Sequence, residues 1–473
     1  MSKKQPNLDS VTSINRDGSH YTLHPADVSG KYTFWRRVTG ALLILIYAAL
    51  PWIKIGGNPA VFLDTANRRF HLIGITIGVQ DLWVLFFLIS GLGFTLFFIT
   101  SLLGRIWCGW TCPYTVFLDH VFRRIERLID GDAPARKRLQ AAPLSASKIL
   151  KRIVKHSLFL LCATLIAHIF ISYFVSLPGL YQNIQSGPSE HALSFGVVVF
   201  LTFVLYFCFA WFREQFCIVV CPYGRIQSAL SDDNTMIIGY DEIRGEPRGK
   251  ASDPNAGDCI DCRRCVNVCP TGIDIREGLQ MECIGCAACI DACNDIMTKL
   301  DRKAGLIRYD SDNGLKQKPR RILRPRIFAY CALMMVGASA FAVTVYQKAR
   351  PFNAQVNKMR GVPFQKDATG VRNIYQIHLF NKRSVDAEFS IKLLEAPEWV
   401  ETSGTTEHIV LESLEEKTYN LVVLAPAQDY DGPFDFIIEV KSENDQSTIE
   451  LKESFQGPNA TLYKSSLNQP ASP

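Results

Sequence analysis

The sequence lacks a dinucleotide-binding fingerprint, because its glycines never form G-x-G-x-x-G after a predicted strand. A nicotinamide or flavin held by such a motif is therefore not expected, and an external donor must supply any electrons that the protein uses. Cysteine is absent between Leu50 and Gly104 and again after Cys331, so neither region can hold a disulfide. Residues 1–30 are polar and show no cleavage site, which predicts a mobile tail rather than a signal peptide.

Apolar residues are abundant and locally concentrated. They make up 48% of the 473 residues, and the formal net charge is +6. The basic residues stand beside apolar runs, where membrane orientation explains them better than nucleic-acid binding does. We therefore expect a membrane protein and no nucleic-acid partner.

Apolar runs that can span a membrane as helices occur five times. They cover residues 38–53, 82–103, 158–177, 192–212 and 327–346. Lysine and arginine crowd the segments before the first, third and fifth runs, and the positive-inside rule places such segments in the cytoplasm. The N-terminus and residues 231–326 are then expected in the cytoplasm, and residues 347–473 on the opposite side of the membrane.

Eight of the fifteen cysteines form two runs with the spacing C-x2-C-x2-C-x3-C, at residues 259–269 and 283–293. This spacing is typical of two-cluster bacterial ferredoxins, in which three cysteines of a run bind one [4Fe-4S] cluster and the fourth binds the other cluster. We expect one cluster on Cys259, Cys262, Cys265 and Cys293, and the other on Cys283, Cys286, Cys289 and Cys269. Pro270 follows the first run as the pattern requires, whereas Asn294 follows the second run.

Zinc and disulfides explain these runs less well. A structural zinc site takes four ligands, often as two C-x2-C pairs, and would leave the third cysteine of each triplet unused. Disulfides do not persist in the cytoplasm, where the predicted topology places these residues. Two [4Fe-4S] clusters are therefore the cofactors that the sequence predicts.

The segment after the fifth apolar run alternates in hydrophobicity as strands do. The alternation covers residues 374–380, 389–394, 408–411, 418–424, 434–440 and 448–451. Short strands at this spacing, separated by turns such as Asp431-Gly432-Pro433, predict an antiparallel sandwich. It contains no His/Cys/Asp constellation, so we expect a docking or support module.

The membrane part contains an internal repeat. W-C-G-W-T-C-P-Y at residues 107–114 corresponds to F-C-I-V-V-C-P-Y at residues 216–223, each after the second helix of a pair. On a helix, the two thiols of a C-x3-C motif point from one face and can bind a soft ion such as Cu(I) or exchange electrons as a dithiol. The four thiols belong to Cys108, Cys112, Cys217 and Cys221. Copper, a third cluster and a thiol relay all stay open, and the duplication disfavours a purely structural role.

Arg105 and Arg213 stand near these motifs, and each motif precedes a helix that starts with proline. Positive charge and helix N-termini favour the thiolate, so we expect the pKa of these thiols to be lowered. His168 lies within the third apolar run, and we favour a neutral imidazole bonded to a nearby carbonyl over a functional role, which stays open. His120 and His156 are weaker candidates. The remaining cysteines, which we expect to serve in packing, are Cys162, Cys208 and Cys331.

The combination of paired C-x3-C-P motifs, a two-cluster ferredoxin insert, a fifth helix and an outer sandwich resembles the CcoG family, also called FixG or RdxA. These proteins are accessory proteins of bacterial cytochrome cbb3-type oxidases, and the resemblance covers the chain from Lys31 onward. The expected fold is an α-helical polytopic membrane protein with five transmembrane helices, an inserted two-cluster bacterial ferredoxin-like domain and a C-terminal all-β Ig-like sandwich. The expected domains begin with a mobile cytoplasmic tail (1–30), followed by two spans with the first CxxxCP motif and an interfacial helix (31–130). A cytoplasmic linker (131–156) leads to two further spans with the second motif (157–230). A cytoplasmic ferredoxin domain (231–326), the fifth span (327–346) and a periplasmic sandwich (347–473) complete the chain.

The resemblance implies a cupric reductase of the bacterial inner membrane, which reduces Cu(II) to Cu(I) during assembly of the oxidase copper centre. The cysteines that match the family's membrane motifs are the catalytic candidates, with copper as substrate or transient ligand: Cys108, Cys112, Cys217 and Cys221. Implied partners are cbb3 oxidase assembly factors, copper carriers and an unidentified cytoplasmic electron donor, and a homodimer stays open.

Two other functions remain open. One is a membrane conduit between quinol and a redox partner, as in the NapH-like polyferredoxins, which share the first four helices and both motif types but lack the sandwich. The other is a non-redox assembly scaffold whose clusters are structural.

Overall fold

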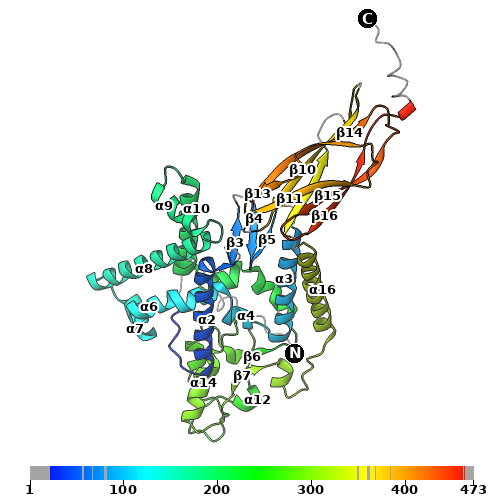
Figure 1. The fold of residues 1–473 in the computed structure, drawn as a ribbon. Coiled ribbons are helices and arrows are strands. Elements are labelled where there is room, and N and C mark those ends of the chain that lie inside the picture. Colours follow the sequence, from blue (N-terminus) through cyan, green and yellow to red (C-terminus); the bar gives the residue numbers. More distant parts are fainter. Residues whose placement is uncertain are drawn as a thin grey trace. The chain divides into compact units, whose positions relative to one another are not determined.

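The computed structural model describes residues 22–55, 58–65, 68–78, 83–348, 351–358, 363–367, 369–383, 385–461 and 463. The chain forms two compact units, residues 1–344 and 345–473 (Figure 1). The first unit contains the apolar helices and all the cysteines, and the second contains the C-terminal strands. Most of the predicted tail, residues 1–21, lies outside the described residues.

Residues 22–30 lie along the cysteine-rich segment. The Ala26 amide donates a hydrogen bond to the Asn267 carbonyl at 2.8 Å, and Arg264 donates to the Asp27 carbonyl at 2.8 Å. Ala26 and Val28 also pack against the buried apolar residues of that segment. This stretch therefore differs from the mobile tail that we expected, because its few apolar side chains cover an apolar surface of the cluster domain.

Among the described residues, five helices are long and apolar enough to cross a membrane, as the sequence predicts. They are α2 (Lys31–Ala49), α3 (Trp83–Leu103), α8 (Ala146–Ile171), α10 (Ala192–Phe207) and α16 (Pro325–Lys348). Helix α8 begins well before the predicted residue 158. The hydroxyl of Ser145 accepts a hydrogen bond from the Lys148 amide at 3.3 Å and so caps a basic first turn.

Helices α3 and α16 pack side by side (Figure 1). A Cβ added to Gly337 would lie only 3.2 Å from the Gly91 Cα, so the two glycines let the backbones approach closely. Gly91 thus permits close contact between the two helices. A Cβ at Gly93 would meet nothing within 4 Å, so this second glycine has no such role.

The segment between α2 and α3 forms two small antiparallel sheets. Strand β1 (Lys54–Ile55) pairs with β2 (Asn58–Pro59), and β3 (Val61–Asp64), β4 (Arg69–Leu72) and β5 (Ile75–Ile77) form a three-stranded meander. The Leu63 amide donates to the Tyr173 carbonyl at 2.7 Å, which ties the meander to the end of α8.

Short helices carry the two C-x3-C motifs. After α3 come α4 (Ile106–Trp110), α5 (Pro113–Phe117), the π-helical turn η3 (Leu118–Phe122), α6 (Arg123–Asp130) and α7 (Ala133–Ala141). Helix α9 (Leu177–Ser186) joins α8 to α10, which is followed by the π-helical turns η4 (Cys208–Phe212) and η5 (Phe216–Val220) and by α11 (Pro222–Leu230). The predicted interfacial helix therefore consists of α5, η3 and α6.

The cluster domain is closed by a strand pair. Strand β6 (Ile237–Tyr240) pairs antiparallel with β7 (Ile307–Asp310). Between them lie α12 (Glu242–Gly245), α13 (Arg264–Asn267), the 3-10 helix η6 (Ile275–Glu277) and α14 (Ala288–Lys299), and α15 (Asp312–Leu315) follows. Its small buried core includes the cysteines themselves, among them Cys259, Cys265 and Cys283. A core built around metal-binding residues depends on the metal for its stability.

Asp291 of α14 joins the cluster domain to the first membrane helix. Its carboxylate accepts hydrogen bonds from the Tyr32 amide at 3.3 Å and from the Thr33 amide and hydroxyl, both at 2.7 Å. A carboxylate at a helix N-terminus satisfies free amides and opposes the helix dipole. Asp291 therefore caps α2 although it lies far away in the sequence.

The second unit is a two-layer antiparallel sandwich, as predicted. One sheet has the strand order β12-β14-β10-β8, with β9 also paired to β10, and the other has the order β13-β11-β15-β16. The strands are β8 (Phe352–Lys358), β9 (Gln365–Lys366), β10 (Gly370–Asn381), β11 (Ala387–Leu394), β12 (Glu401–Gly404), β13 (Ile409–Leu411), β14 (Glu416–Pro426), β15 (Phe434–Ser442) and β16 (Thr448–Phe455). Alternating inward side chains such as Tyr375, Phe389 and Phe436 form its buried core.

We predict that the cluster domain and the sandwich lie on opposite sides of the membrane, because α16 crosses it between them. Ser252 and Ser403 are exposed and suit replacement by cysteine. In spheroplasts, a membrane-impermeant maleimide should label a cysteine at position 403 and not one at position 252. The unsubstituted protein measures the background from its own cysteines, and the reverse labelling pattern would contradict the predicted topology.

Candidate functional site

The eight cysteines of the two runs line two separate cavities. One cavity is lined by Cys259, Cys262, Cys265 and Cys293. The other is lined by Cys269, Cys283, Cys286 and Cys289, and Cys265 reaches it as well. The first cavity thus combines three cysteines of the first run with the last cysteine of the second run. The second cavity combines three cysteines of the second run with the last cysteine of the first run, in addition to Cys265. The crossed ligation that the spacing predicts would use these same sets of cysteines.

Both runs have the same unusual backbone. The third and fifth residues of each run are left-handed, with φ of 52° at Asp261 and 51° at Arg263, and of 68° at Gly285 and 61° at Ala287. A helix, α13 or α14, begins directly after the second of these residues. The left-handed conformation costs a non-glycine residue roughly 1–2 kcal/mol. Such strain at corresponding positions indicates loops that are shaped for a ligand rather than for their own stability.

The chemistry of both cavities suits [4Fe-4S] clusters. Each presents sulfur donors within a largely apolar lining that includes Leu306 and Ile307 in one cavity and Ile238 in the other. Burial raises the pKa of the Cys265 and Cys293 thiols to about 12. These thiols are therefore neutral at physiological pH until positively charged iron displaces their protons.

The two C-x3-C motifs also have matching backbones. The second cysteine of each motif is extended, with φ/ψ of −60°/122° at Cys112 and −65°/111° at Cys221, because a proline follows it. The Cys112 amide donates to the Trp107 carbonyl at 2.9 Å, and the Cys221 amide donates to the Phe216 carbonyl at 2.8 Å. The expectation of one continuous helix through each motif is wrong, since the helical turn ends before the second cysteine. The duplication, however, extends to the backbone conformation.

The thiols of the two motifs lie close to one another. Burial, together with smaller contributions from Cys112 and Cys221, raises the pKa of Cys108 to about 12. Burial also raises the pKa of Cys217 far above its ordinary value, and the other three thiols add to that shift. Direct contacts join the two halves: the Cys108 thiol donates to the side-chain oxygen of Gln227 in α11 at 3.7 Å, and the Tyr114 hydroxyl donates to the Cys208 carbonyl at 3.0 Å. The fold therefore brings the two halves of the repeat to one place.

The predicted lowering of the thiol pKa is wrong for Cys108 and Cys217. Burial outweighs the effect of Arg105, which does act to lower the pKa of Cys108. Arg213 donates to both carboxylate oxygens of Glu126, at 2.7 and 3.2 Å, so a carboxylate compensates its charge. A metal ion must therefore displace protons from Cys108 and Cys217 to bind them at neutral pH.

The first motif touches the second cysteine run directly. A Cβ on Gly109 would lie 2.6 Å from the Ile284 carbonyl oxygen and 2.8 Å from the Cys286 nitrogen. Only glycine allows these backbones to approach so closely. Cys108 packs in the same apolar cluster as Ile284 and Cys286. One thiol of the repeat is thus adjacent to a cysteine that lines the second cavity.

Tyr309 of β7 holds this junction together. Its hydroxyl donates to the Gly285 carbonyl at 2.6 Å and accepts from the Trp110 indole at 3.1 Å. The sequence pattern pointed to the cysteines and not to Gly109, Trp110 or Tyr309. One feature of the sequence does mark Gly109 and Trp110. The glycine and the tryptophans of the W-C-G-W segment have no counterpart in the second motif.

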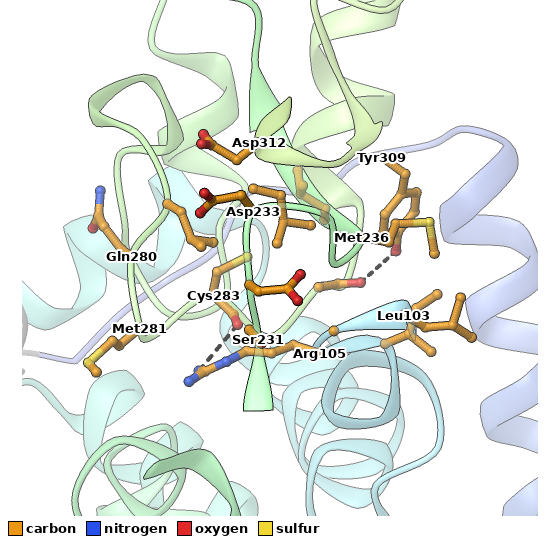
Figure 2. Close-up of a pocket in the computed structure, with 17 residues that line it drawn as sticks. Leu103, Arg105, Ser231, Asp233, Met236, Gln280, Met281, Cys283, Tyr309 and Asp312 are labelled. Carbon is orange, nitrogen blue, oxygen red and sulfur yellow. Dashed lines mark hydrogen bonds between the residues drawn. The ribbon is translucent and has the colours of Figure 1, made fainter. Parts of the chain in front are cut away.

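A cavity of about 260 Å³ opens beside Cys283 (Figure 2). Arg105 lies along its wall, where it donates to the Cys283 carbonyl at 3.4 Å and to the Gly224 carbonyl at 2.7 Å. This arginine therefore connects the first motif, the helix after the second motif and the cysteine run. Met281, with 55% of its surface exposed, also lines the cavity.

The other sequence candidates make ordinary packing and hydrogen-bonding contacts. His168 bonds through Nδ1 to the Thr164 carbonyl at 2.8 Å, which is the structural role that we favoured. His156 bonds to the Tyr206 hydroxyl at 2.9 Å, and His120 lies against Gly40 of α2. Cys162 packs against the aromatic cluster around Phe122 and Phe159.

Within the described part of the chain, no three His, Cys, Asp or Glu side chains are grouped around one point as ligands of a single metal ion.

Models of protein families match most of the chain. A 4Fe-4S dicluster domain matches residues 212–312, a 4Fe-4S binding domain matches residues 83–130, and the Ig-like fold at the C-terminus of FixG matches residues 342–458. Protein RdxA of Cereibacter sphaeroides is 38% identical over 386 residues, which cover 78% of this chain and 81% of RdxA. The chain belongs to the FixG/RdxA family.

Other relatives agree with this membership. Nitrogen fixation protein FixG of Rhizobium meliloti is 39% identical over 302 residues, which cover 61% of this chain and 56% of that protein. Ferredoxin-type protein NapH of Haemophilus influenzae is 23% identical over 300 residues, which cover 58% of this chain and 91% of NapH. The chain is thus a membrane-associated 4Fe-4S electron-transfer protein of the FixG/RdxA family. The match over residues 83–130 includes Cys108 and Cys112, so a cluster at the repeat stays an alternative to copper.

We predict that Cys293→Ala impairs the cluster of Cys259, Cys262 and Cys265, although these residues belong to the other run. Removing the thiol leaves that cavity one sulfur donor short. Cys269→Ala is the matched variant and should impair the other cluster instead. Electron paramagnetic resonance of the reduced protein distinguishes the two clusters, and the opposite assignment would show that the ligands are not crossed.

We predict that Gly109→Ala separates the first motif from the second cysteine run, because the new methyl group collides with backbone atoms. Overpacking of this kind typically lowers the free energy of unfolding by about 1–3 kcal/mol. The matched control is Gly93→Ala, where the added methyl group meets nothing within 4 Å. Thermal unfolding in detergent, followed by cluster absorbance, compares the two. Equal stability of both variants would contradict the proposed tight contact.

Proposed function

We propose that this FixG/RdxA-family protein reduces Cu(II) to Cu(I) in the bacterial inner membrane, for assembly of the copper centre of a cbb3-type cytochrome oxidase. The observation that carries the proposal is the convergence of the two C-x3-C motifs, the first of which packs against the Cys286 loop. The thiols of these motifs belong to Cys108, Cys112, Cys217 and Cys221. Cysteines that would hold one-electron carriers thus lie beside a set of soft sulfur ligands. Reduction of a copper ion requires both an electron carrier and such ligands.

The cysteines of the two cavities would hold the clusters. Cys259, Cys262, Cys265 and Cys293 line one cavity, and Cys269, Cys283, Cys286 and Cys289 line the other. When bound, the two [4Fe-4S] clusters supply carriers that accept and release one electron at a time. The contact of Gly109 with Cys286 keeps the distance from the second cavity to the thiol of Cys108 short, which favours electron transfer between them.

The thiols would bind copper as substrate and favour its reduced form. Each Cu(II) ion takes up one electron, which an external donor supplies, and becomes Cu(I). Soft thiolate ligands stabilise Cu(I) relative to harder ions. Each thiol that becomes a ligand releases one proton. Before copper binds, the Cys108 thiol donates a hydrogen bond to the side-chain oxygen of the buried Gln227 at 3.7 Å. Reduction and capture of copper would then occur at the same place.

The orientation that fits this function has the N-terminus and the cluster domain in the cytoplasm and the sandwich in the periplasm. The basic segments before α2, α8 and α16 support this orientation. A cytoplasmic electron carrier would then supply electrons to the cluster domain. Copper carriers and cbb3 oxidase assembly factors are the partners that we propose for the product.

A conduit that takes electrons from quinol is the second candidate. One observation favours it: a cavity of about 460 Å³ lies between α8, α9 and α10, and its mainly apolar lining includes His168, Asn183 and Thr202. Binding sites for small organic molecules typically measure roughly 300–1,000 Å³ and combine an apolar wall with a few polar groups. Such a cavity within the membrane suits the ring of a quinol. The resemblance to NapH agrees with this alternative.

The decisive experiment replaces Cys108, Cys112, Cys217 and Cys221 together by serine. The variant protein is reduced, freed of reductant and mixed with Cu(II), and a Cu(I)-specific chelator measures the product. We expect both clusters to remain, as shown by absorbance and paramagnetic resonance. The rate of Cu(I) formation should fall by more than about tenfold, the smallest loss typical of a disturbed metal site.

Two controls sharpen this experiment. Cys162→Ser with Cys331→Ser removes thiols that lie away from the motifs, and this variant should keep the wild-type rate. An unchanged rate in the fourfold variant would exclude these thiols as the site of reduction. The quinol conduit would gain support if quinol reduced the clusters and His168→Ala abolished that reduction. A scaffold with structural clusters predicts neither reaction.

A further inference from the structure

A strongly basic pocket lies where α2 meets the cluster domain. Six arginines line it against only two aspartates, Asp27 and Asp119. The arginines are Arg36, Arg37, Arg123, Arg124, Arg127 and Arg136. They come from α2, α6 and α7, and Cys286 of the cluster domain lines the same pocket.

Carboxylates neutralise only part of this charge, although Glu214 also pairs with Arg123 at 3.1 Å and Glu126 lies 3.9 Å from Arg136. Asp119 forms ion pairs with Arg36 and with Arg123, the latter at 2.7 Å. Asp27 pairs with Arg127 at 2.6 Å. Among the described residues, Arg37 and Arg124 have no carboxylate partner, and both are exposed. The rim of the pocket therefore carries positive charge that the protein itself does not compensate.

Two buried arginines also have unused hydrogen-bond donors. The Nε atoms of Arg123 and Arg136 have no partner among the described residues. Both side chains are almost fully buried, with 10% and 5% of their surface exposed, and both line the pocket. A buried N–H group without an acceptor is unfavourable, and an oxyanion in the pocket would supply that acceptor.

The neighbouring histidine adds no charge. Burial and the nearby Arg36 lower the pKa of His120 to about 4, so its imidazole is neutral at physiological pH. The imidazole packs against Gly40 of α2, where an added Cβ would lie 2.4 Å from the ring. The positive charge of the pocket therefore belongs to guanidinium groups, whose planar fork suits the oxygens of a phosphate group.

The size of the pocket limits the ligand. Its volume is about 110 Å³. This is well below the roughly 300 Å³ at which pockets for whole small molecules begin, so a nucleotide or a flavin does not fit inside. A single phosphate group does fit.

The position of the pocket places it at the membrane surface. Arg36 and Arg37 belong to the first turns of α2, which begins a candidate membrane span at Lys31. The adjacent Phe34 and Trp35 are 59% and 53% exposed, as is common for aromatic residues at the interface between lipid and water. Basic pockets between membrane helices bind the headgroups of anionic lipids.

We propose that this pocket binds one phosphate group, carried by an anionic phospholipid or free in solution. The exposed Arg37 and Arg124 would supply positive charge to the ligand, and the unpartnered Nε atoms of Arg123 and Arg136 would donate hydrogen bonds to it. Because Cys286 lines the same pocket, the bound phosphate lies next to the second cysteine cavity.

The test uses the full chain in nanodiscs of phosphatidylcholine, with or without phosphatidylglycerol, and native mass spectrometry to count bound lipid. The variant Arg37→Gln with Arg124→Gln removes the two uncompensated charges and leaves the buried ion pairs intact. Each basic residue near an anionic lipid contributes enough that losing both should weaken phosphatidylglycerol binding by about 30-fold. The matched control, Lys151→Gln with Arg152→Gln, removes two charges from α8 outside the pocket and should keep wild-type binding.

Titration of inorganic phosphate into the nanodiscs without phosphatidylglycerol distinguishes the two sources of the phosphate group. Saturable binding that the rim variant loses and the control keeps assigns the pocket to free phosphate. Binding of phosphatidylglycerol alone, with the same dependence on the variants, assigns it to lipid. If neither probe binds the wild-type protein more tightly than the rim variant, the proposal is overturned. Equal losses in the rim variant and the control would overturn it as well, because the effect would then be one of net charge.

Discussion

The close approach of the Gly109 backbone to the Cys286 backbone is the constraint on which the rest of the first unit depends. Two further glycines make it possible. Gly104 ends α3 in the left-handed conformation, and a Cβ there would lie 2.3 Å from the Met236 carbonyl oxygen. Gly285 approaches the Arg105 carbonyl from the other side, at 3.0 Å for an added Cβ. The end of α3 and the cysteine run therefore fit together through backbone contact, without intervening side chains.

Buried ion pairs hold the second half of the repeat in place. Arg213, which lies just before η5, pairs with Glu126 of α6 at 2.7 Å, and Arg123 reaches Glu214 at 3.1 Å. Removing one partner of a buried pair typically costs about 3–5 kcal/mol, because the other charge is left without compensation. These pairs fix the position of the second motif relative to the first. The two halves thus reach the same place by different means, one by glycine packing and the other by charge.

The burial of the motif thiols has a consequence for chemistry. A buried thiol stays protonated at neutral pH, so it does not react readily with oxidants or attract stray cations. A soft metal ion that enters the site can still replace the proton, because the metal–sulfur bond compensates for the loss. Burial therefore gives selectivity for a ligand that binds sulfur strongly. The same argument about burial applies to the cysteines of the two cavities. Their loops are also strained, with left-handed backbone at Asp261, Arg263 and Ala287.

The sequence by itself determined the five apolar helices, the C-terminal sandwich and the pattern of the two cysteine runs. These features follow from local periodicity and fixed spacing, which the chain carries without reference to distant residues. Only the tertiary structure decided which elements meet. Gly109, Tyr309 and Asp291 act through partners far away in the sequence, so no local pattern marks them. The pKa of the Cys108 thiol also depends on burial, which outweighs the nearby Arg105 that the sequence suggested would lower it. The arginine pocket likewise exists only because α2, α6 and α7 converge on the cluster domain.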